Sequence, residues 1–256
     1  MPLNRREFIN LVAASIAAGV LASTPSAHAA KGSKIKAIAF DAFPILDPRP
    51  VFALAEQLFP GKGTELSNAW RTRQFEYQWL RALSGQYADF WQATEDSLVF
   101  AAELLKLDLT SDKRKLLMEA YLGLKAWPDV PLALKSLKSA GIRLAFLSNA
   151  TPKILDSGIE NSGLEGVFEH VLSTDKIKTY KPDPRAYQMA IDAFGLKKEE
   201  ILFVAFAGWD AAGAKSFGYT TFWVNRLNLP AERLGASPDA VGQNLNDLVG
   251  FVKARQ

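Results

Sequence analysis

The sequence predicts an α/β fold in three layers, a parallel β-sheet between two layers of helices, with a block of helices inserted after the first strand. Two patterns lead to this prediction. From Pro131 onward, short apolar runs alternate with segments of helical periodicity, as in the β-α-β units of a parallel sheet. Between residues 48 and 127, apolar residues recur at helical spacing and no strand pattern interrupts them. A chain of 256 residues, 48% of them hydrophobic, is long enough for one such core with an insertion.

The first predicted strand is the apolar run at residues 35–40. It is short and lies between Lys34 and Pro44, which favours a buried strand over a helix. Asp41 closes this run, at the position where open α/β sheets bind their ligands. Asp41 is therefore the candidate reactive group, and the alternative is a solvated residue that merely ends the strand.

The inserted helices are expected to form a cap over the crevice of the sheet. Helical periodicity predicts them over residues 51–59, 65–83, 90–107 and from 110 onward. Thr110, Ser111 and Asp112 have the residue types of an N-cap and first turn. These patterns assign residues 34–47 and 128–256 to a core domain and residues 48–127 to a helical cap domain.

The rest of the chain alternates between the two kinds of element. It predicts helices over residues 131–140, 152–162, 184–194, 211–217 and 245–252, and strands over residues 143–147, 168–172, 201–205 and 220–224.

Composition excludes several classes of function. The net charge is only +3, and the basic residues are scattered among acidic ones, which argues against a nucleic-acid-binding protein. Because the chain has no cysteine, it has no disulfide, no thiolate nucleophile and no cysteine-ligated metal.

Residues 1–29 have the pattern of an export signal that resembles the twin-arginine type. Arg5 and Arg6 precede an uncharged apolar stretch, and Ala27-His28-Ala29 offers a signal-peptidase site. An uncleaved anchor is disfavoured because the stretch is shorter than the roughly 20 residues that span a bilayer. We expect cleavage before Ala30 and a mature protein in the periplasm, without stable membrane association.

Polar residues come directly after four of the predicted strands. Asp41 follows the first, Ser148 and Asn149 follow strand 143–147, Lys181 comes after strand 168–172, and Asp210 follows strand 201–205. Because parallel strands end at one edge of the sheet, these side chains are expected to converge there.

These motifs resemble the haloacid dehalogenase (HAD) superfamily. The core residues that carry the resemblance are Asp41 after Ile38-Ala39-Phe40, Leu147-Ser148-Asn149, Tyr180-Lys181-Pro182-Asp183 and Trp209-Asp210. The inserted helices are similar to the cap of the L-2-haloacid dehalogenases (type II), on Trp70-Arg71, Gln74, Glu76-Tyr77, Trp79-Leu80-Arg81, Phe90 and Gln92-Ala93-Thr94-Glu95-Asp96. The resemblance covers essentially the whole chain after the leader and implies a HAD-like, Rossmann-like core.

The resemblance also implies a reaction. Asp41 would displace the halide from a short (S)-2-haloalkanoic acid and form an ester, and water would cleave that ester to an (R)-2-hydroxyalkanoic acid. Lys181 would favour the ionised form of Asp41. Asp210, in the family's water-activating position, would assist the second step together with Lys181.

The remaining site residues are implied in the same way. Ser148 would hold the substrate carboxylate, and Arg71, Asn149 and Trp209 would receive the halide. An apolar wall of Phe43, Phe75, Phe90 and Trp209 would surround the alkyl part, with Tyr187 beside Lys181 in the substrate-binding set.

No metal or other cofactor is implied. The superfamily's magnesium phosphatases carry a second Asp two residues after the nucleophile, and here that position is Phe43, so a hard cation would lack oxygen ligands. The family also suggests a homodimer formed through the cap helices and a small 2-haloacid as the only ligand.

The sequence departs from the family at four positions. Pro44 and Ile45 stand where the family has Gly and Thr, and Ala205 and Ala207 replace Ser and Asn. The lost hydroxyl and amide groups would have positioned Asp41, Lys181 and the attacking water.

Alternatives therefore remain open. One is a catalytically impaired protein that binds a small anion, which Ile45, Ala205 and Ala207 favour. Another is a phosphatase-like hydrolase, which Phe43 disfavours. A Ser-His-Asp hydrolase is set aside because His170, the one histidine left after cleavage, lies in a strand pattern.

Taken singly, the site residues also have structural explanations. Arg71 could be a solvated helix residue, Phe75 and Phe90 plain core, Ser148-Asn149 a helix cap and Asp210 a helix N-terminal acid.

Overall fold

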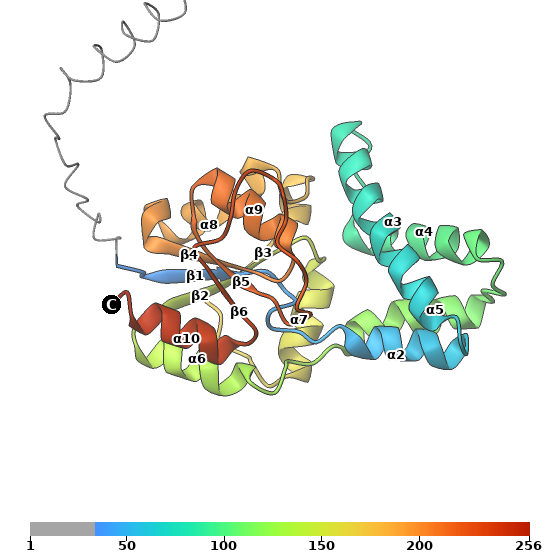
Figure 1. The fold of residues 1–256 in the computed structure, drawn as a ribbon, viewed down its shortest axis with the longest axis horizontal. Coiled ribbons are helices and arrows are strands. Elements are labelled where there is room, and N and C mark those ends of the chain that lie inside the picture. Colours follow the sequence, from blue (N-terminus) through green and yellow to red (C-terminus); the bar gives the residue numbers. More distant parts are fainter. Residues whose placement is uncertain (1–33) are drawn as a thin grey trace, which may run out of the picture. The chain divides into compact units, whose positions relative to one another are not determined.

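The computed structural model describes residues 34–256, which fall in one compact unit. The expected export signal at residues 1–29 and its cleavage lie outside the described residues. Figure 1 shows a parallel sheet with helices on both sides, so the predicted α/β class is confirmed. The division into a core domain (34–47 and 128–256) and a cap domain (48–127) stays a prediction.

The described strands form one parallel sheet. They are β1 (Ala37–Phe40), β2 (Arg143–Ser148), β3 (His170–Ser173), β4 (Ile201–Ala205), β5 (Thr220–Val224) and β6 (Ala240–Gly242). Their order is β3-β2-β1-β4-β5-β6, so β1 lies between β2 and β4. Phe40, the last residue of β1, pairs with Phe146 and Val204 on these neighbours. The residue after β1 is therefore flanked by the ends of two other strands.

Alternate residues of the strands face two separate helical layers. The core helices are α6 (Val130–Ser139), α7 (Pro152–Asn161), α8 (Pro184–Phe194), α9 (Gly208–Phe217) and α10 (Leu245–Lys253). Ile38 and Phe40 belong to the apolar cluster shared with α6, α7 and α10, whereas Ala37 and Ala39 belong to the cluster shared with α8 and α9. A strand buried on both faces explains why β1 is apolar at every position.

Four α-helices form the insertion between β1 and α6, as predicted. They are α2 (Arg49–Leu58), α3 (Gly63–Leu83), α4 (Phe90–Leu104) and α5 (Ser111–Glu119), coloured from light blue to green in Figure 1. Thr110 caps α5 by accepting from the Lys113 N–H. Hydrogen bonds join this insertion to the core, including Trp79 Nε1 to the Lys181 carbonyl at 3.1 Å and Tyr180 Oη to the Ala88 carbonyl. No helix within residues 34–256 combines the length and apolar character needed to cross a bilayer.

The buried face of α3 is more polar than its amphipathic pattern predicts. Gln74 and Gln78 are buried, whereas Leu80 and Leu83 are 59% and 86% exposed. The apolar side chains near the end of α3 therefore do not mark its inner face.

Several boundaries differ from the predicted ones. β3 begins at His170 because the ring of Phe168 packs on Phe146, with centroids 4.2 Å apart, so Phe168 is apolar without being in the strand. His170 itself is only half-buried on this edge strand and is not a core residue. α4 ends at Leu104, because Lys106 adopts a left-handed φ of 54°.

Two short features were also misjudged from the sequence. α9 begins at Gly208, three residues before the predicted start, so Trp209 and Asp210 lie in its first turn. β6 has three residues, too few to give a periodic signal, and was not predicted.

Gly63 begins α3, although the sequence pattern assigned it to the preceding turn. A Cβ on Gly63 would lie 2.2 Å from Glu56 Cα in α2, so only glycine allows the two helices to pack this closely.

Gly63→Ala is expected to lower the free energy of unfolding by about 1–3 kcal/mol, because the added methyl overlaps the backbone of α2. The control is Gly250→Ala in α10, where a Cβ meets open space and higher helix propensity should raise stability by up to about 1 kcal/mol. Urea denaturation measures both variants. Equal stability of Gly63→Ala and the unaltered protein would contradict the close packing of α2 on α3.

Candidate functional site

The four strand ends bring their polar residues together. Asp41 follows β1, Ser148 is the last residue of β2, Lys181 lies between β3 and α8, and Asp210 stands in α9 directly after β4. Because β1 is flanked by β2 and β4, Asp41 lies in the middle of this group. The predicted convergence at the carboxyl edge of the sheet is therefore observed.

Lys181 is the link between two carboxylates. Its Nζ lies 2.9 Å from Asp41 Oδ1 and 2.5 Å from Asp210 Oδ2, and its side chain is 1% exposed. The ring of Phe203 lies beneath the ammonium, with its centroid 5.1 Å from Nζ. One positive and two negative groups thus share a site with almost no access to water.

The protonation of this cluster follows from burial and from its charges. Burial alone would lower the pKa of Lys181, but attraction to Asp210 and Asp41 outweighs it and raises the pKa. Burial raises the pKa of Asp210 to about 6, aided by the like charge of Asp41 and opposed by Lys181. One positive charge is thereby held between the carboxyl groups of Asp41 and Asp210.

The two oxygens of Asp41 have different surroundings. Oδ1 accepts from Lys181 Nζ and lies 3.5 Å from Ser148 Oγ. Within residues 34–256, Oδ2 accepts only one hydrogen bond, a long one of 3.4 Å from the Phe43 N–H. Pro44 has no N–H to offer, and the Ile45 N–H donates to the Ala42 carbonyl. Oδ2 is therefore the oxygen that is left to react.

Asp41 opens onto a small cavity of about 50 Å³ between the sheet edge and the insertion. Because one water needs about 10–15 Å³ by this measure, the cavity admits a ligand of only a few heavy atoms. Its walls are formed by Asp41, Phe43, Pro48, Phe52, Arg71, Gln74, Phe75, Gln78, Phe90, Tyr121, Ser148, Asn149, Ala150, Phe206, Ala207 and Trp209.

Arg71 brings a positive charge to the wall contributed by α3. Its guanidinium lies over the Phe52 ring at 5.4 Å, and no carboxylate of residues 34–256 comes within salt-bridge distance of it. Burial lowers the pKa of Arg71. A partly desolvated cation that has no protein anion beside it suits the binding of an anionic ligand.

Most of the predicted site residues lie on this wall. They are Asp41, Phe43, Arg71, Phe75, Phe90, Ser148, Asn149 and Trp209. Thr151, and not Ser148 or Asn149, caps α7, so the helix-cap explanation of those two residues does not hold.

Lys181, Asp210 and Tyr187 lie outside the wall, and only Lys181 contacts Asp41 directly. Tyr187 was placed in the substrate-binding set, but its ring is fully buried and its Oη donates to Asp210 Oδ1 at 2.8 Å. Tyr187 therefore supports Asp210 and does not line the cavity. Burial also raises the pKa of Tyr187 well above its usual value, so the phenol stays protonated.

Sequence reasoning missed several wall residues, among them Phe52, Gln74, Gln78, Tyr121 and Phe206. Gln74 and Gln78 follow Arg71 by three and seven positions, so they share its helix face, and this spacing was a usable signal. Phe52, Tyr121 and Phe206 come from three separate segments and had no such signal.

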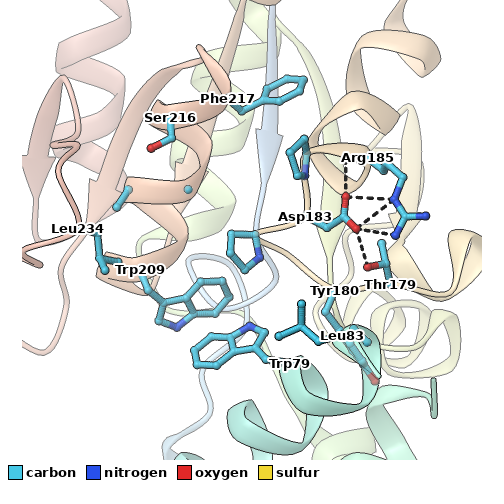
Figure 2. Close-up of a pocket in the computed structure, with 15 residues that line it drawn as sticks. Trp79, Leu83, Thr179, Tyr180, Asp183, Arg185, Trp209, Ser216, Phe217 and Leu234 are labelled. Carbon is cyan, nitrogen blue, oxygen red and sulfur yellow. Dashed lines mark hydrogen bonds and ion pairs between the residues drawn. The ribbon is translucent and has the colours of Figure 1, made fainter. Parts of the chain in front are cut away.

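A much larger groove, of about 990 Å³, lies beside the small cavity and shares Trp209 with it. Figure 2 shows Trp79 and Trp209 close together on one side of this groove and the Asp183–Arg185 pair on the other. That pair belongs to the capping turn of α8, and the groove contains none of Asp41, Lys181 and Asp210. Of these three residues only Asp41 lines either space, and it lines the small cavity and not the larger groove.

Potential metal ligands are sparse in this part of the molecule. Within residues 34–256, no group of three or more His, Asp or Glu side chains is arranged to hold a metal ion.

Comparison with known proteins agrees with the geometry. A family model described as haloacid dehalogenase-like hydrolase matches residues 19–218. The chain is 45% identical over 206 residues to an (S)-2-haloacid dehalogenase of Pseudomonas sp. (strain YL), covering 80% of this chain and 89% of that protein. It is 44% identical over 207 residues to haloacetate dehalogenase H-2 of Moraxella sp. (strain B), covering 80% of this chain and 92% of that protein.

Solved structures resemble the chain to a similar degree. The L-2-haloacid dehalogenase RSc1362 is 43% identical with a TM-score of 0.84, over 86% of this chain and 100% of the other. The L-2-haloacid dehalogenase of Xanthobacter autotrophicus, with chloropropionic acid covalently bound, is 32% identical with a TM-score of 0.77, over 86% and 98%.

Lys181→Met is expected to lower the free energy of unfolding at pH 7 by about 3–5 kcal/mol, because it leaves two buried carboxylates without their cation. The loss should shrink on going to pH 5, below the pKa of Asp210, since a protonated Asp210 needs no counter-charge. Denaturant titrations at the two pH values measure both effects.

The control is Lys115→Met, which removes an exposed pair with Glu119 and should cost less than about 1 kcal/mol at either pH. If the two variants lost equal stability, the buried cluster would not have this energetic role.

Proposed function

Because this chain belongs to the haloacid dehalogenase-like hydrolases, we propose that it removes the halogen from short (S)-2-haloalkanoic acids by hydrolysis and yields (R)-2-hydroxyalkanoic acids. The observation that carries the proposal is Oδ2 of Asp41, which is engaged only by a long hydrogen bond, in a small cavity that Arg71 of α3 also lines. A carboxylate nucleophile and a cation without a carboxylate partner in one small cavity suit a small molecule that ends in a carboxylate and releases an anion.

In the first step, Asp41 Oδ2 attacks C2 of the substrate from the side opposite the halogen. The C2–halogen bond breaks as the ester bond forms, the halide leaves with the bonding electron pair, and the configuration at C2 inverts. Ser148 holds the substrate carboxylate, while Arg71, Asn149 and Trp209 stabilise the departing halide, where charge develops in the transition state.

In the second step, water attacks the carbonyl carbon of the ester and not C2. The bond between this carbon and Oδ2 breaks, the hydroxy acid leaves with Oδ2 and one proton of the water, and the other proton passes to solvent as the Asp41 carboxylate re-forms. Because no bond to C2 changes, the single inversion is kept. Lys181 remains bonded to Oδ1 and stabilises the negative charge that forms on this oxygen. Asp210 does not reach the cavity wall, so it acts through Lys181, which it holds in place and keeps charged.

The surroundings of Asp41 also support a reaction that needs no metal and takes a small substrate. Phe43 occupies the position of the second acid of magnesium phosphatases and forms part of the apolar wall, with Phe75 and Phe90. The volume of about 50 Å³ favours two- and three-carbon substrates over longer ones. The similar haloacetate dehalogenase and the similar structure with bound chloropropionic acid support the same size class.

A catalytically impaired anion-binding protein is the second candidate, because one set of contacts is missing. Ile45 brings no hydroxyl to Asp41, and Ala205 and Ala207 bring no polar group to Lys181 or to the cavity. Lost hydrogen bonds of this kind slow the hydrolysis of the ester more than its formation, because the water must be positioned in the second step.

The proposal extends to export and assembly. We expect the twin-arginine-type leader to direct the protein to the periplasm, which cell fractionation can test.

The exposed leucines on the inserted helices support a homodimer through this region; they are Leu80, Leu83, Leu104 and Leu116. A monomeric mass in light scattering would contradict the homodimer.

The mature protein is expected to release halide from L-2-chloropropionate and monochloroacetate without added metal and equally in the presence of a chelator. Asp41→Ala should abolish this release, because no other described carboxylate lines the cavity. Halide assays on both proteins measure the effect.

Intact mass distinguishes the two candidates. A stalled ester adds one propionate group to Asp41 with little turnover, whereas an unmodified mass without halide release favours the anion-binding protein. Retained halide release by Asp41→Ala would remove Asp41 from its role.

The value of kcat/KM is expected to rise with pH through about 6, as Asp210 loses its proton. Below this pH a protonated Asp210 attracts Lys181 less, so the ammonium binds Asp41 more strongly and weakens the nucleophile. Above it, Asp210 competes with Asp41 for the ammonium. Asp210→Asn should remove this limb and lower the rate by about 10²–10⁴-fold. A limb near pH 6 that persists in Asp210→Asn would assign it to another group.

A further inference from the structure

A chain of hydrogen bonds fixes the orientation of two amide side chains at the cavity. The backbone N–H of Lys181, which can only donate, lies 2.9 Å from Asn149 Oδ1, and Thr174 Oγ1 lies 3.3 Å from the same oxygen. Asn149 Nδ2 must then point the other way, where it donates to Gln78 Oε1 at 3.2 Å. The amide oxygen of Gln78 is thereby committed, and its nitrogen faces away from Asn149.

This orientation leaves Gln78 Nε2 as a buried donor without an acceptor. Gln78 is 0% exposed, lines the small cavity, and its Nε2 has no hydrogen-bond partner among residues 34–256. Trp209 Nε1 is likewise buried and unpartnered on the same wall. An unsatisfied buried donor is costly, so its retention in a cavity points to a ligand that accepts from it.

The neighbours of Gln78 define the charge of that ligand. Arg71 lies two turns earlier on the same face of α3 and also lines the cavity without a carboxylate partner. Arg71, Gln78 and Trp209 together offer donors, and none of the three offers an unoccupied acceptor to the cavity. Such a set binds an anion.

We propose that Gln78 Nε2 hydrogen-bonds the halide as it leaves C2, which makes Gln78 an additional catalytic residue; this inference rests on the proposed function. In-line displacement places the halide on the side of C2 opposite Asp41. Asp41 and Ser148 come from the sheet edge, whereas Arg71 and Gln78 come from α3 and line the same cavity, and we assign these α3 donors to the leaving group.

The inference changes the part played by Asn149. Its Nδ2 is already bound to Gln78 Oε1, so Asn149 acts as a positioning residue and Gln78 delivers the donor to the halide. Asn149 connects the Gln78 donor to the backbone N–H of Lys181. The ammonium of the same lysine contacts Asp41, the nucleophile.

The test compares Gln78→Leu and Gln78→Glu with the unaltered mature protein. Both variants lose the donor, and Gln78→Glu keeps the shape and an oxygen for Asn149 if the leucine variant folds poorly. We expect inhibition by chloride and bromide to weaken about tenfold to hundredfold, kcat to fall by a similar factor, and KM to change little. Halide quenching of tryptophan fluorescence gives the binding constants without turnover.

The dependence on the leaving group separates a catalytic role from a structural one. Chloride accepts hydrogen bonds more strongly than bromide, so the loss of kcat in Gln78→Leu should be larger for L-2-chloropropionate than for L-2-bromopropionate. The matched control is Asn225→Leu, a buried amide outside the cavity whose nitrogen already donates to the Leu229 carbonyl. It should leave the ratio of the two substrates as it is in the unaltered protein.

The test distinguishes a failure of the Gln78 assignment from a failure of the proposed function. If the unaltered protein releases halide and the Gln78 variants keep its halide inhibition, the assignment of Gln78 is overturned and the proposed function stands. A rise in KM alone, with unchanged halide inhibition, also overturns it, because the amide then contacts the carboxylate. If the unaltered protein neither binds nor releases halide, the proposed function fails and the inference fails with it.

Discussion

The ion pairs of Lys181 are the interaction on which the rest of the site depends. One ammonium compensates two carboxylates that reach it from different segments, Asp41 from the end of β1 and Asp210 from the first turn of α9. Without this cation, the burial of either acid would be prohibitive. The cluster thereby ties the centre of the sheet to a flanking helix, and Tyr187 extends it into α8 through Asp210.

The two carboxylates of the cluster differ in how their oxygens are hydrogen-bonded, and this difference bears on their chemistry. Asp41 uses Oδ1 for Lys181 and turns Oδ2 to the cavity, whereas Asp210 has both oxygens engaged, by Lys181 and Tyr187. Two acids joined by the same lysine thus differ in their environment, which matches the different roles we propose for them, Asp41 as the nucleophile and Asp210 as the group that holds Lys181.

Much of this arrangement could be predicted from the sequence, because strands and their carboxyl ends have strong local signals. Asp41 and Ser148 are found by locating apolar runs and inspecting the residues at their carboxyl ends. Tyr187 shows where such reasoning stops: its position near Lys181 is evident, but whether a ring faces the cavity or the core depends on packing between α8 and α9. The polar inner face of α3 could not be predicted for a related reason. An apolar pattern locates an inner face only where the buried side chains are hydrophobic, whereas Gln78 is buried beside a cavity.

The indole of Trp209 forms part of two walls at once, that of the small cavity and that of the large groove beside it. The rings of Phe75 and Trp79 pack edge-on against it, at 5.4 Å and 5.3 Å between centroids, and so keep this partition in place. A few aromatic rings, and not the fold around them, thus separate the small cavity from the large groove. Loss of the Trp209 side chain would open the small cavity into the large groove. A descendant of this chain would therefore need only one substitution to gain space for a bulkier compound.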